Sequence, residues 1–393
     1  MFLFQPGFSQ VKEYIIKHTT PVREADFNTT NDADLLPIEK AIGNKRIVML
    51  GELYHGDGEE LRLKSRLVRY LHEHMGFNVI AFESDFFSLN HGWEAFKKNK
   101  ISLDSLLYLS VFPVWTQCMQ ANDLFQYINN NAGKLRITGF DNRGISGYGM
   151  RHLKRSIDGF LREQQVSFTT HPSYNTFITA IGRTPWILNG NNREALDSLL
   201  KLMPIVIEQV SDPFYLHVLK GLLINYTLAL HYRYNKERKD HPQHDFQMAE
   251  NLKWLASDKF ANEKIIIWAH NSHVEKGPLE NVTHRSYNSM GYYFSQDPQL
   301  AAQTYTIGLT CYEGTGGLTI SDVTEKVTKP HKKSIESWIH SMGYPYAFTD
   351  LTFQQEEDLY YMKTYINTAS ELPWKKFYDG ILYVREAKPC LKK

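Results

Sequence analysis

Acid–base chemistry is the chemistry that this sequence offers most clearly. Histidines and glutamates stand at the C-terminal ends of three short apolar runs. These candidate catalytic residues are Glu52, His55, Glu83, His270 and His273. A neutral imidazole can remove a proton from water, and a neighbouring carboxylate stabilises the imidazolium that forms. The sequence therefore predicts a general-base site, provided that the fold brings these side chains together.

Each of these residues also has a structural interpretation. Glu52 could accept hydrogen bonds from backbone N–H groups at a turn, and His55 could be an ordinary turn residue. Glu83, at the end of an apolar run, has to be paired, hydrogen-bonded or protonated if that run is a buried strand. His270 and His273 could be solvated residues at the start of a helix. Their joint occurrence at three strand ends favours one shared site over these separate interpretations.

The apolar runs have the length and composition of buried β-strands. They span residues 46–51, 78–83, 135–141 and 264–270. Near-continuous apolarity indicates strands that are covered on both faces, as in parallel sheets packed between helices. Open parallel sheets bind ligands at the carboxyl ends of their strands, which is where the ionisable residues stand. We therefore predict an α/β fold with a mostly parallel central sheet flanked by helices, and with an all-helical insertion.

A helix is predicted between the first two strands, over residues 57–75. Asp57 with Glu60 three residues later forms a capping box at its start, and Gly76 ends it. We assign its charged residues to the solvent-exposed face: Glu60, Lys64, Arg66 and Glu73.

Three segments follow from the periodicity of the remaining chain. Residues 1–149 form the first half of the α/β core, and residues 261–393 form the second half. Between them, helical periodicity dominates residues 150–260, which we interpret as a helical insertion that caps the cleft. Asp141 and Arg143 follow the third strand and could pair with each other to orient the site.

The charge composition argues against nucleic acid and membranes as binding partners. The 44 Lys+Arg and 43 Asp+Glu residues leave a formal charge of +1, which provides no field for gathering nucleic acid or an anionic membrane surface. No apolar stretch is long enough to span a membrane, and the N-terminus lacks the features of a signal peptide. We expect a cytoplasmic protein. Cys118, Cys311 and Cys390 are odd in number and widely separated, so we expect neither a cysteine zinc site nor a disulfide framework.

Absent motifs narrow the reaction further. The sequence contains no G-x-S-x-G, no G-x-x-x-x-G-K-[ST] and no H-E-x-x-H. A serine nucleophile on a strand–helix elbow, a P-loop and a zinc-protease helix are therefore not predicted. Acid–base chemistry by histidine and glutamate remains, with or without a metal.

Two longer blocks resemble the erythromycin esterase family: VMLGELYHG at residues 48–56 and IWAHNSHV at residues 267–274. Shorter similar blocks are GFD at 139–141, MAENLKWL at 248–255 and SMG at 289–291. The resemblance implies metal-independent hydrolysis of an ester by water that a histidine activates.

The resemblance also implies roles for individual residues. His55 looks like the general base, with Glu52 and Glu83 as its supporting carboxylates. His270 and His273 look like a second histidine pair that lines the other wall of the cleft. The remaining candidates are implied or possible contacts to the substrate: Lys64 or Arg62 on the helix after the His-Gly turn, together with Asp141 and Arg143.

Three functions stay open from the sequence. The first is a hydrolase of a small-molecule ester or lactone that needs no cofactor and no metal. The second is a metal-dependent hydrolase that uses the same histidine and glutamate cluster as ligands. The third is a non-catalytic metabolite- or glycan-binding protein linked to polysaccharide biosynthesis. All three imply a small-molecule partner, and the oligomeric state is left open.

Overall fold

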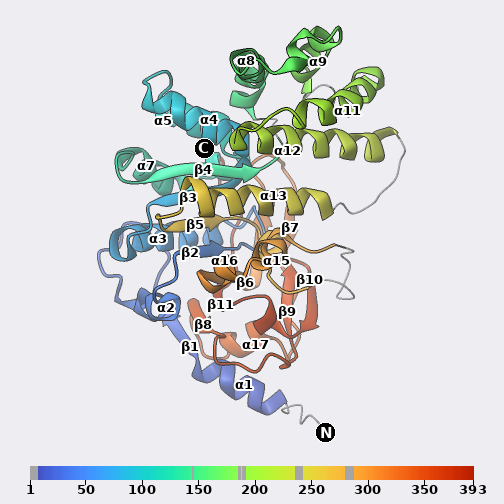
Figure 1. Cartoon of the computed structure of the whole chain (residues 1–393). Helices are drawn as coiled ribbons and strands as arrows, with labels where there is room; N and C mark the ends of the chain where they lie inside the picture. The colour runs from blue at the N-terminus through green and yellow to red at the C-terminus, as the bar shows by residue number, and fades with distance from the viewer. Residues whose placement is uncertain (1–7, 144–145, 185–186, 188–191, 235–241, 279–286) are drawn as a thin grey trace. The chain divides into compact units, whose positions relative to one another are not determined.

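The computed structural model describes residues 8–143, 146–184, 187, 192–234, 242–278 and 287–393 (Figure 1). The chain divides into two compact units. The first unit comprises Met1–Ala81, Pro113–Arg136 and Ala256–Lys393, and the second comprises Phe82–Phe112 and Ile137–Leu255. Both units are therefore assembled from separate segments of the chain, and the described helices between residues 147 and 254 lie in the second unit.

A central β-sheet is the main element of the fold. Its strand order is β1-β8-β11-β6-β2-β5-β3-β4, and β7 pairs with β6. Its strands are β1 (Thr19–Val22), β2 (Ile47–Leu50), β3 (Val79–Asp85), β4 (Arg136–Asp141), β5 (Ile265–Trp268), β6 (Thr304–Gly317), β7 (Thr324–Lys326), β8 (Tyr346–Asp350) and β11 (Gly380–Ala387). In the middle of the sheet β2 runs parallel to both β5 and β6, and β6 runs parallel to β11. Pairing with β8 is antiparallel, and β9 (Tyr360–Tyr365) with β10 (Thr368–Leu372) forms a separate antiparallel pair.

Helices account for most of the remaining described chain. In the first unit they are α1 (Phe8–Lys17), α2 (Leu36–Ile42), α3 (Gly58–Met75), α6 (Pro113–Thr116), α7 (Asn122–Asn130), α14 (Asn271–Val274), α15 (Met290–Ser295), α16 (Pro298–Ala302) and α17 (Ile335–His340). In the second unit they are α4 (Phe86–Lys97), α5 (Leu103–Ser110), α8 (Gly147–Glu163), α9 (Tyr174–Ile181), α11 (Arg193–Ile207), α12 (Pro213–Ala229) and α13 (Pro242–Trp254). Short 3₁₀ or π segments occupy Ala33–Leu35, Met119–Ala121, Ser167–Thr170, Leu230–Tyr234, Leu255–Lys259 and Trp374–Lys376. None of the described helices is both long and apolar enough to cross a membrane.

The predicted fold class is confirmed. The four apolar runs form β2, β3, β4 and β5, within a few residues of the predicted ends. Every residue of β2 and β5 is buried, because both strands lie inside the sheet and both of its faces are covered there. Continuous apolarity therefore predicted these strands correctly.

Helix α3 has the predicted ends but not the predicted exposed face. The Asp57 carboxylate accepts the N–H groups of Glu59 and Glu60, and Gly76 ends the helix with a φ of +72°. The Glu60 carboxylate does not return to the backbone of Asp57 as in a capping box, because it accepts the N–H of Leu53 at 2.7 Å instead.

The assignment of Glu60, Lys64 and Arg66 to solvent was wrong, since all three are buried and only Glu73 of that set is exposed. Buried charged groups require partners, and Arg66 finds them in Asp32 and Asp34.

The expectation of no disulfide was also wrong. Cys118 and Cys390 are bonded to each other, while Cys311 is a buried free thiol. The two bonded residues are separated by 272 positions in sequence, so their spacing along the chain carried no sign of the pairing. The fold brings the end of the chain beside the segment that follows α6, where Met119 N–H donates to the carbonyl of Leu391.

Candidate functional site

The loop between β2 and α3, residues 51–57, carries the first two candidate residues. Backbone hydrogen bonds fix it from neighbouring segments. The N–H of Asn271 donates to the Glu52 carbonyl at 2.8 Å, and the N–H of Leu53 donates to the Glu60 carboxylate. A loop that is anchored in this way presents its side chains from a rigid position, as an active site requires.

Glu52 is the centre of the polar cluster and is fully buried. Its Oε1 accepts hydrogen bonds from Nδ1 of His55 and, at 2.9 Å, from Nε1 of Trp115. Its Oε2 accepts a hydrogen bond from Nζ of Lys64 at 2.8 Å. Burial by itself would raise the pKa of the Glu52 carboxyl, but the Lys64 ammonium and the His55 ring outweigh it and lower the pKa to about 2. Glu52 is therefore a carboxylate at neutral pH.

His55 and His270 lie next to each other, with ring centroids 5.0 Å apart. Nε2 of His270 is 2.9 Å from the carbonyl oxygen of Leu53, and its Nδ1 accepts the N–H of Ser272. Because a carbonyl can only accept, Nε2 of His270 carries the proton and the ring is neutral in this arrangement. The His55 side chain is 31% exposed, whereas His270 is buried. His55 is thus the more accessible of the two rings.

Lys64, a predicted contact to the substrate, lies in the interior of the protein. It is fully buried, and its Nζ contacts the Ala269 carbonyl at 3.2 Å and lies 3.9 Å from the centre of the Trp268 ring. Its contact with Glu52 makes it a positioning residue for that carboxylate. Arg62, two residues earlier on α3, has a side chain that is 40% exposed, and its Nη1 lies 3.5 Å from Oε1 of Glu59.

The structure places His273 and Glu83 in different parts of the molecule. His273 belongs to α14 in the first unit, is partly exposed, and donates its backbone N–H to the His270 carbonyl. Glu83 is buried in β3 and belongs to the second unit. The juxtaposition of Glu83 with His55 stays a prediction.

Asp141 and Arg143 form a pair in the second unit. Nε of Arg143 is 3.4 Å from Oδ2 of Asp141, and its backbone N–H donates to Oδ1 at 2.9 Å. Asp141 also lines a small pocket of that unit together with Asp85, Asn142 and His217. Both polar side-chain atoms of Asn142 are buried without a hydrogen-bond partner among the described residues. Asn142 is a polar group of this pocket that sequence reasoning missed, and no motif marks it.

Trp115 is the main residue of the cluster that sequence reasoning did not assign. It is buried in α6 and donates to the same Glu52 oxygen as His55. Its ring centroid lies 5.5 Å from that of His55, in an edge-on arrangement. A single tryptophan within an apolar stretch carries no local signal of this role, because its contact with Glu52 exists only in the folded chain.

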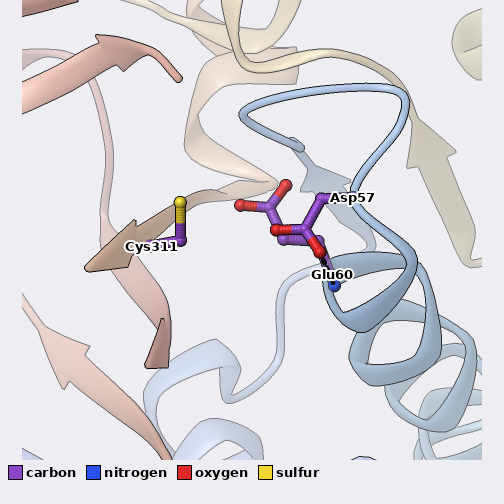
Figure 2. A group of neighbouring side chains, drawn as sticks. All are labelled: Asp57, Glu60 and Cys311. Carbon is purple, nitrogen blue, oxygen red and sulfur yellow. Dashed lines mark hydrogen bonds between the residues drawn. The ribbon is translucent and has the colours of Figure 1, made fainter. Parts of the chain in front are cut away.

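Metal-ligand spacing occurs elsewhere in the first unit. One group of possible metal ligands is found among the described residues: Asp57, Glu60 and Cys311 (Figure 2). Their ligand atoms all lie within 4.8 Å of one another. The cluster around Glu52 is not among such groups for the residues that the structure describes. Its arrangement of donors around one carboxylate is suited to orienting and stabilising an imidazole.

Comparisons with known proteins agree with the fold. A family model described as erythromycin esterase matches residues 211–386. "Putative hydrolase YbfO" of Bacillus subtilis (strain 168) is 24% identical, over 96% of this chain and 91% of that protein. "Erythromycin esterase type II" of Escherichia coli is 23% identical, over 91% of this chain and 93% of that protein. Among solved structures, an erythromycin esterase mutant in its open conformation superposes with a TM-score of 0.65 at 15% identity, covering 94% of this chain and 98% of the other.

Proposed function

Because the chain belongs to the erythromycin esterase family, we propose that it is a hydrolase that cleaves an ester or lactone bond of a small molecule with water activated by His55. The family supports hydrolysis in general. The observation that supports this mechanism is the buried Glu52 carboxylate bonded to Nδ1 of a partly exposed histidine. A carboxylate on one ring nitrogen fixes the tautomer, so that the other nitrogen carries the lone pair that can accept a proton.

The proposed reaction begins at Nε2 of His55, the nitrogen opposite Glu52. Nε2 takes a proton from water as the water oxygen attacks the carbonyl carbon of the substrate. The tetrahedral intermediate then collapses, the carbon–oxygen bond to the leaving group breaks, and Nε2 returns the proton to the departing oxygen. Glu52, which is ionised at neutral pH, stabilises the imidazolium between these steps. General-base assistance of this kind contributes roughly 10²- to 10⁴-fold in rate.

The neighbouring residues act through Glu52 and His55 in this proposal. Lys64 and Trp115 hold the carboxylate in place, and His270 holds the Leu53 carbonyl of the same loop. Preorganised donors of this kind remove the need for reorganisation during the reaction. We also propose Glu83 as a second supporting carboxylate and His273 as the partner of His270 on the other wall of the cleft. Arg62, Asp141 and Arg143 are proposed contacts to the substrate.

The test is hydrolysis of a panel of macrolides, simple lactones and simple esters by the wild type and by His55→Ala. We expect at least one member to be hydrolysed and its kcat to fall by about 10²- to 10⁴-fold in the variant. His74→Ala, which removes an exposed histidine of α3, is the matched control and should keep wild-type activity. Equal turnover by wild type and His55→Ala contradicts the proposal. A ligand that the wild type binds but leaves unchanged would instead support the non-catalytic metabolite- or glycan-binding alternative.

A further inference from the structure

A second buried polar group lies in the first unit and takes no part in the proposed reaction. It consists of Asp57 and Glu60 at the start of α3 and of Cys311 on β6, whose side chains face one another in Figure 2. One carboxylate or sulfur atom from each residue lies within 4.8 Å of the other two. All three residues are at most 1% exposed.

Each carboxylate of this group has one satisfied oxygen and one unsatisfied oxygen. Oδ1 of Asp57 accepts the N–H groups of Glu59 and Lys388, and Oε2 of Glu60 accepts the N–H of Leu53. Oδ2 of Asp57 and Oε1 of Glu60 are buried with no hydrogen-bond partner among the described residues. Backbone donors fix the orientation of metal-binding carboxylates in the same way, while the opposite oxygen binds the ion. Unpaired buried oxygens of this kind are costly unless a ligand satisfies them.

The buried acidic side chains of this group are stable only if they hold protons or bind a cation. Burial raises the pKa of both carboxyls and of the Cys311 thiol, and the carboxylates raise the thiol pKa further. Two lysines lie nearby: Lys363, whose own pKa is lowered by burial, and Lys64, which acts on Glu60 but is paired with Glu52. Glu336 acts on both Lys363 and the Cys311 thiol. A divalent ion would allow all three side chains to be ionised together, because it supplies the charge that the buried group lacks.

We infer that Asp57, Glu60 and Cys311 form a binding site for one divalent metal ion of the zinc or cobalt type. A thiolate with two carboxylates is a ligand set that suits these ions, and it leaves a fourth position for water. A bound ion of this type would hold the three atoms at metal–ligand distances of about 2.0–2.3 Å. Since Asp57 caps α3 and Glu60 holds Leu53, the bound ion would brace the loop that carries Glu52 and His55.

Cobalt binding to the full-length protein tests this inference without any substrate. Cys118 and Cys390 are bonded to each other, so Cys311 is the free thiol that can give a thiolate-to-cobalt absorption band. We expect chelator-treated wild type to develop that band on titration with Co²⁺, to saturate at one ion per chain and to release protons. Added Zn²⁺ should remove the band, and bound metal should raise the melting temperature.

Conservative variants assign the ligands. Cys311→Ser should abolish the band. Asp57→Asn and Glu60→Gln keep the oxygen that accepts the backbone N–H groups, so they should fold and yet bind Co²⁺ at least about tenfold more weakly. Asp85→Asn changes a buried carboxylate of the second unit, outside the group, and is the matched control, with binding retained.

The inference is overturned if wild type shows no band at saturating Co²⁺ while thiol counting in denaturant finds Cys311 reduced. An equal band in folded Cys311→Ser overturns it too.

Discussion

Glu52 shows how a single buried carboxylate can organise a site. Its hydrogen-bond donors come from three places in the sequence: His55 in the same loop, Lys64 on α3 and Trp115 on α6. An ionised group with no exposed surface is stable only with such partners, and removing one partner leaves an uncompensated charge. The energetics of the site can therefore be measured one partner at a time.

The Glu52–Lys64 ion pair should show strong coupling in a double-mutant cycle. We expect Glu52→Gln and Lys64→Met each to lower the free energy of unfolding by about 3–5 kcal/mol, and the double variant to lose clearly less than the sum. Denaturant unfolding of the four proteins gives the coupling energy. The exposed pair Glu94–Lys97 on α4 is the control, with an expected coupling of about 0.2–1 kcal/mol. Additive losses for Glu52 and Lys64 would contradict the buried ion pair.

The acid stability of the protein should report the depressed pKa of Glu52. Its pKa is lowered from 4.5 to about 2 in the folded protein, so ionised Glu52 stabilises the fold fully above about pH 4.5. That contribution, about 3 kcal/mol, is lost as the pH falls from about 4.5 to about 2. Unfolding free energies of wild type and Glu52→Gln, measured across this range, should therefore converge toward low pH. Parallel curves would show that Glu52 has no such shift.

The element that defines the site is the loop after β2. Gly51 begins this loop and packs directly against Asn271, whose side chain bonds both the N–H and the carbonyl of Leu309 on β6. A β-carbon at position 51 would lie 2.1 Å from Oδ1 of Asn271. The loop can approach α14 this closely only because residue 51 is glycine. This close approach places the loop, which carries His55, beside the start of α14, which directly follows His270.

Gly51→Ala should disturb this element strongly. We expect a loss of at least about 2 kcal/mol in the free energy of unfolding, because the added methyl overlaps a side chain that cannot move without breaking two hydrogen bonds. Gly159→Ala is the control, since a β-carbon there meets no atom within 4 Å and Gly159 is an exposed residue inside α8. That control should gain about 0.5–1 kcal/mol. Thermal unfolding measures both, and equal stability of the two variants would contradict the packing described.

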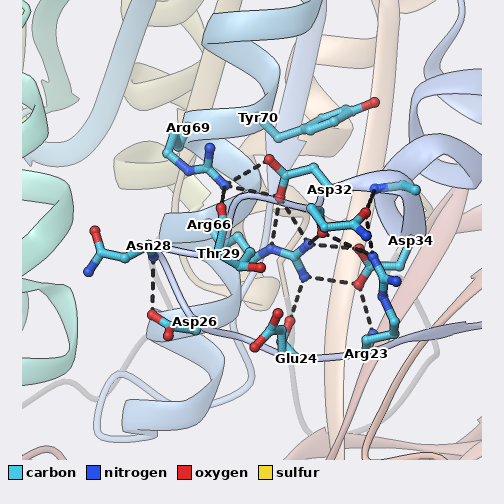
Figure 3. A network of polar contacts seen from close by, with 12 residues as sticks. Arg23, Glu24, Asp26, Asn28, Thr29, Asp32, Asp34, Arg66, Arg69 and Tyr70 are labelled. Atoms are coloured by element: carbon cyan, nitrogen blue, oxygen red, sulfur yellow. Dashed lines mark hydrogen bonds and ion pairs between the residues drawn. The ribbon is translucent and has the colours of Figure 1, made fainter.

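Helix α3 also shows which features the sequence could predict and which it could not. Its ends were predictable because Asp57 and Gly76 act locally. Its buried face was not, because Arg66 is satisfied by Asp32, Asp34 and the Glu24 carbonyl, which lie in the separate segment 24–34 that precedes α2 (Figure 3). Periodicity counts charged residues as exposed, and it cannot register partners that only folding brings near.

In the candidate site, too, the features that depend on local sequence could be predicted, and the contacts between distant residues could not. The strand ends that carry Glu52, His55 and His270 were predictable from continuous apolar runs, and the structure brings these three residues together. The positioning roles of Lys64 and Trp115 were not predictable, because both depend on contacts with Glu52 across the fold. Long-range pairs of this kind have no signature in the spacing of residues.

At the scale of the whole molecule, the Cys118–Cys390 disulfide ties the end of the chain to the segment after α6. The Cys390 N–H also donates to the carbonyl of Gly56 in the loop that carries His55. Closing a span of 272 residues restricts the unfolded chain strongly, so the bond stabilises the folded first unit.

Removing this disulfide should lower the stability of the protein. We expect Cys118→Ser with Cys390→Ser to reduce the free energy of unfolding by about 2–4 kcal/mol. Denaturant unfolding of the double variant and of wild type measures the difference. A reducing agent should lower the stability of wild type and leave the double variant unchanged. Identical unfolding of wild type with and without reductant would contradict a stabilising bond.

Chemical rescue of His55→Ala by imidazole tests most directly whether the His55 ring activates water. If the His55 ring activates water beside Glu52, the variant loses about 10²- to 10⁴-fold in kcat on a substrate that the wild type hydrolyses. Added imidazole can occupy the place of the missing ring. It should restore part of the hydrolysis rate, and the restored rate should rise in proportion to the concentration of neutral imidazole. If His55→Ala turns over as fast as the wild type and its rate does not change with added imidazole, His55 is not the general base.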